Sequence, residues 1–245
     1  SIIFKSPTTT EDPSIGIING INELCIRAKI DPTKIDYFFH GTTTATNAIL
    51  EYDGAECGMI TNKGFKDIIH IGRHQRPQSF SIQQEIPWQD RPLIKRRFRK
   101  TVSHRIVPPK GQIIQKLDET EIVKLANEFT EKNILSIAVC FLFSYLDPSY
   151  EEKVKKILLE TNPKFFVTTS SSLIPQFREF ERFTTAAINA FVGPKVEQYI
   201  ENLRKKLGEN KITQKLYIMS SNGGVSTVQT IRDKPVLLII LKSMH

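Results

Sequence analysis

The spacing of hydrophobic positions alternates between strand and helix periods over the first 75 residues. A short apolar run at residues 2–5 predicts a strand, and Asp12-Pro13 predicts the start of a helix. Residues 37–39 predict a second strand, a Gly-Thr-rich turn leads into a helix through 45–49, and 57–61 predict a third strand. The first helix presents one apolar face, made of Ile17, Ile21, Leu24 and Ala28. This alternation predicts a sheet covered by helices.

A second alternating stretch begins near residue 112. Asp118 to Glu121 have the arrangement of a capping box, and 134–143 are apolar enough for a buried strand. Asp147-Pro148 predicts another helix start, and 165–168 and 216–219 predict further strands. A long helix is expected from 178 to 207, interrupted at Gly193-Pro194. The pattern therefore predicts an α/β protein with a first unit at 1–75 and a second at 112–245.

Residues 76–111, between these units, form a proline-rich basic excursion that we expect to contain loops and short strands. The formal net charge of the chain is +8, and seven basic residues without an acid lie between Arg91 and Arg105. The rest of the chain carries only +1. A solvated hairpin or a subunit contact is favoured over a nucleic-acid site, because Phe98 is the only aromatic residue among these cations.

Composition places the chain among ordinary globular proteins. Its 245 residues are 40% hydrophobic and 24% charged, and no apolar run reaches the roughly 18 residues that a membrane span needs. Three widely spaced cysteines, Cys25, Cys57 and Cys140, form no disulfide or zinc pattern. With no signal-peptide pattern at residue 1, these features predict a cytoplasmic protein without a membrane partner.

Three segments are candidates for chemistry. His40 to Asn47 follows a strand and opens a helix, so it is either an anion site or a well-capped helix start. Arg178 to Thr185 carries oppositely charged residues three positions apart, which form helical ion pairs or aim charged groups into a cleft. Ser221 to Val225 contains two glycines that either contact a ligand or form a plain tight turn. The histidines, including His74, have no metal-ligand spacing, and no metal site is expected.

Taken together and in order, these segments resemble the N-terminal part of the hydantoinase/5-oxoprolinase family. The resemblance is carried by these stretches: His40–Glu51, Gly54-Ala55, Thr61–Asp67, Ile71–Arg73, Arg76-Pro77, Ala138–Leu142, Ser144-Tyr145, Pro148, Arg178–Arg182, Asn189-Ala190 and Ser221–Gly224. It implies an actin-like (ribonuclease-H-like) ATPase fold, with residues 112–245 running into the start of the hydantoinase A-type domain. It also implies ATP-driven activation of an amide or carbonyl, followed by ring opening or carboxylation, commonly completed by a second subunit.

The resemblance also implies site residues. Catalytic or cleft-bracing positions are Arg178, Glu179, Glu181 and Arg182, and substrate- or phosphate-binding positions are His40, Gly41, Thr42, Thr43, Asn47, Asn222, Gly223 and Gly224. Two positions that carry histidine in the family hold Phe143 and Tyr150. The family's Asp-x-Gly-Gly phosphate hairpins are absent from this sequence. We therefore expect a fold incomplete at both ends, with ATP and Mg²⁺ implied for the complete family protein but not bound tightly by this chain alone.

The expected function is the N-terminal portion of an ATP-dependent cyclic-amide hydrolase that is inactive alone. Its expected partners are a small cyclic-amide substrate and a second hydantoinase-type subunit or missing domain. Two alternatives stay open: a non-catalytic truncated or split subunit that acts as a binding scaffold, and a ketone carboxylase subunit fragment. The apolar tail from Val236 to Leu241 favours the scaffold because such a tail requires burial.

Overall fold

A computed structural model describes residues 1–7, 9, 12–73, 78, 80–84, 86–212 and 214–239. His74, Arg76-Pro77 and the last two residues of the predicted apolar tail, 240 and 241, lie outside these ranges. Two compact units are present, one made of residues 1–53 and 195–245 (unit 1) and the other of residues 54–194 (unit 2). These boundaries do not coincide with the predicted ones at 75 and 112, because the two ends of the chain fold together.

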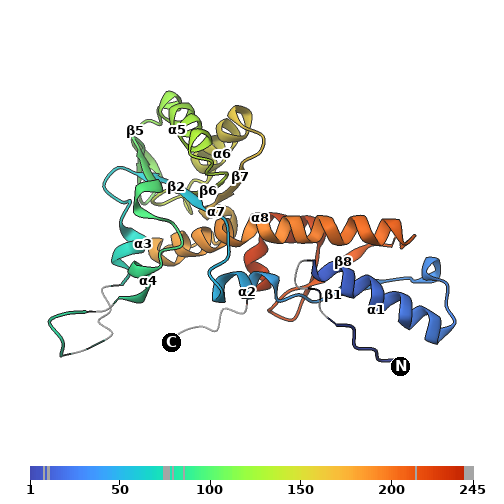
Figure 1. Ribbon diagram of the computed structural model, residues 1–245. Helices are drawn as coiled ribbons and strands as arrows, with labels where there is room; N and C mark the ends of the chain where they lie inside the picture. The colour runs from blue at the N-terminus through green and yellow to red at the C-terminus, as the bar shows by residue number, and fades with distance from the viewer. Residues whose placement is uncertain are drawn as a thin grey trace. The chain divides into compact units, whose positions relative to one another are not determined.

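Unit 1 is built around a three-stranded sheet in the order β1-β8-β9 (Figure 1). Strand β1 runs parallel to β8, although Phe38 and its partner Leu216 are 178 positions apart in the sequence, and β9 is antiparallel to β8. The elements of this unit are α1 (Pro13–Ala28), η1 (Pro32–Lys34), β1 (Phe38–His40), α2 (Thr44–Leu50), β8 (Leu216–Met219), β9 (Val225–Thr227), α9 (Val228–Asp233) and η3 (Pro235–Leu238).

The core of unit 1 joins α1 to the second half of the long helix α8 (Glu179–Glu209), which continues from unit 2. Ile18 of α1 packs with Leu203 and Leu207 of α8, and Phe38 and Leu216 of the sheet cover this cluster. Asp12 caps α1 as predicted, since its carboxylate accepts a hydrogen bond from the Ser14 amide at 3.0 Å. The strand predicted at 2–5 is wrong: these residues have no regular structure and Ile3 is 81% exposed, because no neighbouring strand pairs with them.

Unit 2 contains a four-stranded, fully parallel sheet in the order β3-β2-β6-β7. Helices α5 and α6 cover one face of the sheet and the first half of α8 covers the other (Figure 1). Its further elements are β2 (Cys57–Asn62), α3 (Ile68–Ile71), α4 (Pro87–Asp90), η2 (Arg96–Phe98), β3 (Arg99–Val102), β4 (Arg105–Val107), β5 (Gln112–Gln115), α5 (Glu119–Glu131), β6 (Ser136–Cys140), α6 (Ser149–Thr161), β7 (Phe166–Thr169) and α7 (Ser170–Leu173).

The basic segment from Arg91 to Arg105 contributes a strand to the central sheet of unit 2, so it is not a separate excursion. Its strand β3 forms the edge of the central sheet of unit 2, paired with β2 along Met59 to Asn62. Lys95 and Arg97 pair with Glu56, Arg96 and Arg99 pair with Asp67, and Lys100 pairs with Glu128. Carboxylates from three separate places in unit 2 therefore offset much of the positive charge that stands out in the sequence.

Helix α8 continues through Pro194, so the predicted interruption is wrong. A proline inside a helix cannot donate to the carbonyl four residues earlier, here that of Ala190. In this structure the buried Ser136 hydroxyl of β6 donates to the Ala190 oxygen at 2.6 Å and takes the place of the missing amide. The sheet thus provides the hydrogen bond that the helix lacks.

Replacing Ser136 with alanine tests this compensation. Because the Ala190 carbonyl would be buried without a donor, Ser136→Ala is expected to lower the free energy of unfolding by about 1–3 kcal/mol. Pro194→Ala restores an amide donor at the right place, so the double variant should recover at least half of that loss in urea denaturation. Additive effects of the two substitutions would contradict the compensation.

Candidate functional site

The predicted ligand-binding segments of unit 1 lie at one edge of its sheet. Because β1 and β8 are parallel and in register, with His40 opposite Ile218, the segments that follow both strands begin at the same edge. These segments are Gly41–Thr43 after β1 and Ser220–Gly224 after β8. A Cβ atom at Gly41 would lie 3.8 Å from the Met219 sulfur, which shows how closely Gly41 approaches the end of β8. Carboxyl ends of parallel strands are the usual ligand-binding edge of α/β sheets.

His40 belongs to a partly buried polar cluster at this edge. Its Nε2 atom lies 2.6 Å from the Tyr199 hydroxyl of α8, and the Thr42 hydroxyl also interacts with Tyr199. Burial lowers the pKa of His40 to about 4 and raises the pKa of Tyr199. Both groups are consequently neutral near pH 7. The neutral imidazole of His40 has one N–H donor and one nitrogen acceptor with which it can hydrogen-bond an amide.

The helix start that follows is mostly occupied by its own hydrogen bonds. The Thr42 hydroxyl accepts from the Thr44 amide at 3.2 Å and lies 2.8 Å from the Thr44 hydroxyl. Thr43 occupies the N-cap position without a side-chain cap, and Asn47 is exposed on α2. Helix α2 has only seven residues. Its first amide is therefore occupied by the Thr42 hydroxyl, and anion binding there stays a prediction.

The turn after β8 is a tight turn that bonds to itself. Gly223 has φ of +89°, a left-handed conformation that favours glycine, and its amide donates to the Ser220 carbonyl at 3.1 Å. The Gly224 amide donates to the Asn222 side-chain oxygen at 3.2 Å. The turn is exposed throughout, and Ser221 is held by the Leu237 carbonyl. Ligand contact by Asn222, Gly223 and Gly224 stays a prediction.

The charged segment of unit 2 contains residues in very different surroundings. Arg178 is exposed with φ of +79° and stacks over Phe177, while Glu181 forms an ion pair with Arg73. Glu179 is partly exposed and lies 3.7 Å from Arg182, the i,i+3 pairing that the sequence predicted. Arg182 itself is completely buried. This segment belongs to unit 2, whereas His40–Asn47 belongs to unit 1.

Arg182 braces the carboxyl edge of the sheet in unit 2. Its guanidinium donates to the Phe141 carbonyl at 2.9 Å, the Gln176 carbonyl at 2.7 Å and the Ser170 hydroxyl at 3.1 Å. These acceptors lie just after β6, after α7 and at the start of α7. A charged group with three hydrogen bonds in a buried position holds its neighbours firmly. The geometry supports a bracing role, whereas a catalytic one is untested.

Glu151 completes this network and was missed by the sequence reasoning. One carboxylate oxygen accepts from the Phe141 amide at 2.6 Å and the Ser170 hydroxyl at 2.7 Å. The other accepts from the Ser171 amide at 2.8 Å and the Ser171 hydroxyl at 2.7 Å. Burial raises the pKa of Glu151, and these four hydrogen bonds oppose that shift. The sequence did contain a signal: Glu151 lies three and seven residues before the apolar Val154 and Leu158, which places it on the buried face of the helix.

Other chemistry finds little support in the described residues. Among them, no group of three or more His, Cys, Asp or Glu side chains is arranged to hold a metal ion. All three cysteines are free and buried, and burial raises the pKa of the Cys57 thiol to about 12, so it is protonated at neutral pH. Within the described ranges, no helix is both long and apolar enough to cross a membrane.

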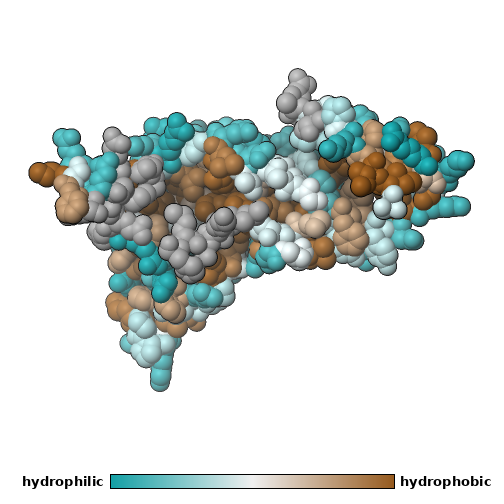
Figure 2. Space-filling view, turned by 90° about the horizontal axis from the view of Figure 1, so that it is seen from below, coloured by the Kyte–Doolittle hydropathy of each residue, from teal (hydrophilic) through white to brown (hydrophobic). Residues whose placement is uncertain are grey.

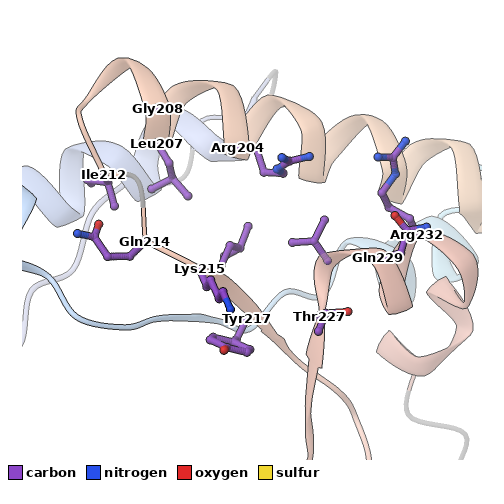
Figure 3. Close-up of a pocket in the computed structure, with 12 residues that line it drawn as sticks. Arg204, Leu207, Gly208, Ile212, Gln214, Lys215, Tyr217, Thr227, Gln229 and Arg232 are labelled. Atoms are coloured by element: carbon purple, nitrogen blue, oxygen red, sulfur yellow. The ribbon is translucent and has the colours of Figure 1, made fainter.

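A groove of about 680 Å³ lies on unit 1, away from the edge formed by His40 and the β8–β9 turn (Figure 3). It is lined by the last turns of α8, the start of β8, and residues of β9 and α9, so it lies at the opposite end of β8 from Asn222. Arg204 and Arg232 line it, but they pair with Glu201 and Glu197. None of the predicted site residues lines this groove.

One face of the unit 1 sheet carries exposed hydrophobic side chains. Tyr37, Phe39 and Tyr217 form a stacked row with ring centroids 6.1 and 5.5 Å apart, and Met219 and Val225 are each more than half exposed. Figure 2 also shows hydrophobic surface gathered on unit 1. Contiguous apolar surface of this kind typically marks a site of protein contact.

These features define an α/β protein with a mixed sheet in unit 1 and a parallel sheet in unit 2, whose candidate sites lie at the carboxyl ends of parallel strands. Residues 1–162 match the hydantoinase/oxoprolinase N-terminal region, and residues 182–240 match the hydantoinase/oxoprolinase family. The chain belongs to the hydantoinase/oxoprolinase family. Its mixed α/β architecture is the one expected from the actin-like fold that the family resemblance implies.

Relatives of this chain include enzyme subunits. A protein of Methanocaldococcus jannaschii is 36% identical over 240 residues, covering 97% of this chain and 34% of the relative. The caprolactamase subunit alpha of Pseudomonas jessenii is 27% identical, covering 96% and 34%, and the acetophenone carboxylase gamma subunit of Aromatoleum aromaticum is 26% identical, covering 92% and 33%. The chain thus spans about a third of the length of these relatives.

A solved structure shares this architecture. The crystal structure of the ATP-dependent caprolactamase from Pseudomonas jessenii superposes with a TM-score of 0.82 at 26% identity, over 98% of this chain and 35% of that one. The α/β fold class predicted from the sequence is therefore confirmed.

The buried His40 predicts a pH-dependent stability. Since its folded-state pKa of about 4 is below the unfolded value of 6.5, acid favours the unfolded chain, which binds the extra proton. Stability is full above about pH 6.5 and falls as the pH drops towards 4. Between pH 7 and 5, the free energy of unfolding measured in urea should fall by about 2 kcal/mol more for the wild type than for His40→Gln. Equal losses in the two proteins would contradict this prediction.

The Glu151 network predicts a large effect of a single-atom change. In Glu151→Gln, either orientation of the new amide turns its NH₂ group towards a backbone amide donor, that of Phe141 or that of Ser171. The free energy of unfolding should fall by about 2–4 kcal/mol. The neighbouring Glu152→Gln is the control, because Glu152 is exposed and, among the described residues, its carboxylate accepts one hydrogen bond, from Thr169 at 2.7 Å. Its loss of unfolding free energy should therefore stay under about 1 kcal/mol.

Proposed function

We propose that this chain provides the substrate-facing part of an ATP-dependent enzyme that opens a small cyclic amide. The proposal rests on family membership along the chain together with one geometric observation: the His40–Thr43 segment and the Asn222–Gly224 turn meet at the carboxyl edge of one sheet. The neutral His40 imidazole and the Tyr199 and Thr42 hydroxyls offer uncharged hydrogen-bonding groups to an amide ring there. Cytoplasmic location is part of this proposal.

The described residues do not by themselves fit a magnesium–triphosphate complex. Such a complex needs cations or amides for the phosphates and oxygen ligands for the metal. The amides of Thr44, Gly223 and Gly224 already donate within their own segments, and the described residues offer no metal-holding cluster. We therefore propose that ATP binding requires groups from a second subunit or domain.

The open face of the unit 1 sheet supports such a partner. Its stacked aromatic row and its exposed Met219 and Val225 would be stabilised by burial against another protein surface. Relatives of this chain are named as subunits, alpha in the caprolactamase and gamma in the acetophenone carboxylase. The partner proposed for this chain is accordingly a second hydantoinase-type subunit or domain.

Calorimetric titration of the isolated chain with ATP and Mg²⁺ tests whether ATP binding requires a partner. A helix start contributes only about 0.3–1 kcal/mol at an exposed site, far below the roughly 8 kcal/mol of micromolar binding. The isolated chain should therefore bind ATP·Mg²⁺ with a dissociation constant above about 100 μM. A low-micromolar constant would overturn the proposed need for a partner.

The reaction is tested on the chain purified with its associated proteins from its own cells. With ATP, Mg²⁺ and 5-oxoproline, hydantoin or caprolactam, the assembly should form ADP and ring-opened product in equal amounts, whereas the isolated chain forms neither. Incorporation of labelled bicarbonate without ring opening would instead favour a carboxylase subunit, the alternative supported by the acetophenone carboxylase relative. An assembly inactive in both assays would favour the scaffold alternative.

A further inference from the structure

A small cavity in unit 2 is lined by two residues that each carry a buried polar atom without a hydrogen-bond partner among the described residues. Its volume is about 100 Å³, and its walls come from α3, the segment before η2, the start of β3 and the first turns of α8. Five of the side chains that line it are apolar: Ile69, Pro92, Leu93, Phe180 and Ala187. The other three are Arg91, Arg99 and Thr184. None of these eight residues belongs to the site proposed above.

Arg99 has unused hydrogen-bonding capacity at this cavity. It is 3% exposed, and its Nε atom donates to the Ile94 carbonyl at 2.9 Å. One terminal nitrogen forms an ion pair with Asp67 at 3.7 Å, too far for a hydrogen bond, and has no hydrogen-bond partner among the described residues. Asp67 is already engaged by Arg96 through two contacts of 2.9 Å. One carboxylate therefore serves two guanidinium groups, and a positive charge is left over at Arg99.

Thr184 presents a second unused group. A threonine hydroxyl in a helix ordinarily donates to the carbonyl four residues earlier. The next residue, Thr185, does so, with its hydroxyl 2.9 Å from the Glu181 carbonyl. The Thr184 hydroxyl is buried and has no partner among the described residues. Two residues that line the same cavity thus each carry an unsatisfied buried donor, although buried polar groups are nearly always hydrogen-bonded.

We infer that this cavity binds a small organic carboxylate. The guanidinium of Arg99 and the hydroxyl of Thr184 match the two oxygens of a carboxylate, and the leftover positive charge matches its negative charge. The apolar walls match a short hydrocarbon body. The volume is smaller than the roughly 150 Å³ of a cavity that holds benzene, which limits the ligand to about two to four carbon atoms. Phosphate fits poorly, because it has four oxygens and no apolar part.

The inference is independent of the proposed function and is tested by binding alone. The complete chain is titrated calorimetrically with propionate, propionamide and inorganic phosphate, without nucleotide. We expect propionate to bind with a dissociation constant of about 1 mM or below, and propionamide at least about tenfold more weakly because it lacks the charge. Phosphate should not displace propionate.

Thr184→Val and Thr185→Val form a matched pair on the same helix. Thr184→Val should weaken propionate binding about fivefold or more, since a polar partner of the carboxylate is lost, whereas Thr185→Val should leave it unchanged. Arg99→Lys, which keeps the charge but loses the planar donor geometry, should also weaken binding. Circular dichroism shows that each variant is folded. The inference is overturned if propionate does not bind at 20-fold the expected constant, if propionamide or phosphate binds equally well, or if the two threonine variants behave alike.

Discussion

The parallel pairing of β1 with β8 is the constraint on which the arrangement of unit 1 depends. Phe38 to His40 are hydrogen-bonded beside Leu216 to Ile218, so the first and last parts of the described chain must close on each other. Closing so long a loop costs conformational entropy that grows only slowly with loop length. Burial of Ile18, Leu203 and Leu207 beneath the sheet offsets that cost. Because the strands are parallel, the segments after both lie at one edge.

In unit 2 the carboxyl edge of the sheet is held by charge rather than by hydrophobic contact. Glu151 and Arg182 do not contact each other directly in the hydrogen-bond pattern but meet through shared neighbours. The Ser170 hydroxyl accepts a hydrogen bond from Arg182 and donates one to Glu151. The Phe141 amide donates to Glu151, and the Phe141 carbonyl accepts from Arg182. The loops that follow β6 and β7 are fixed by one carboxylate and one guanidinium. A buried ionic network of this kind specifies geometry more reliably than it adds stability.

The elements of this fold were predictable from local patterns, but their pairing was not. Asp12 marked the start of α1 and the apolar run at 134–143 marked β6, because capping and burial depend on neighbours in sequence. The continuity of α8 through Pro194 was not predictable, since it depends on Ser136, which lies 58 residues away. The place of β3 in the central sheet was hidden by its basic composition, as the acids that pair with it are distant in sequence. Among the candidate site residues, the proximity of Gly41 to the β8 end likewise depends on β1–β8 pairing.

These cases share one physical feature: a buried polar group without a hydrogen-bond partner nearby in sequence finds one on another segment of the fold. Ser136 replaces the amide that Pro194 lacks, four donors surround Glu151, and three acceptors surround Arg182. Thr185 bonds back to its own helix, as does Thr130 of α5 to the Ala126 carbonyl at 2.9 Å. Within the described residues, five residues depart from this rule: Thr61, Arg99, His104, Thr184 and Gln214. Of these, Arg99 and Thr184 line the same cavity. Since each unmet buried donor weakens the fold, two of them beside one small cavity are best explained by a ligand that satisfies both at once.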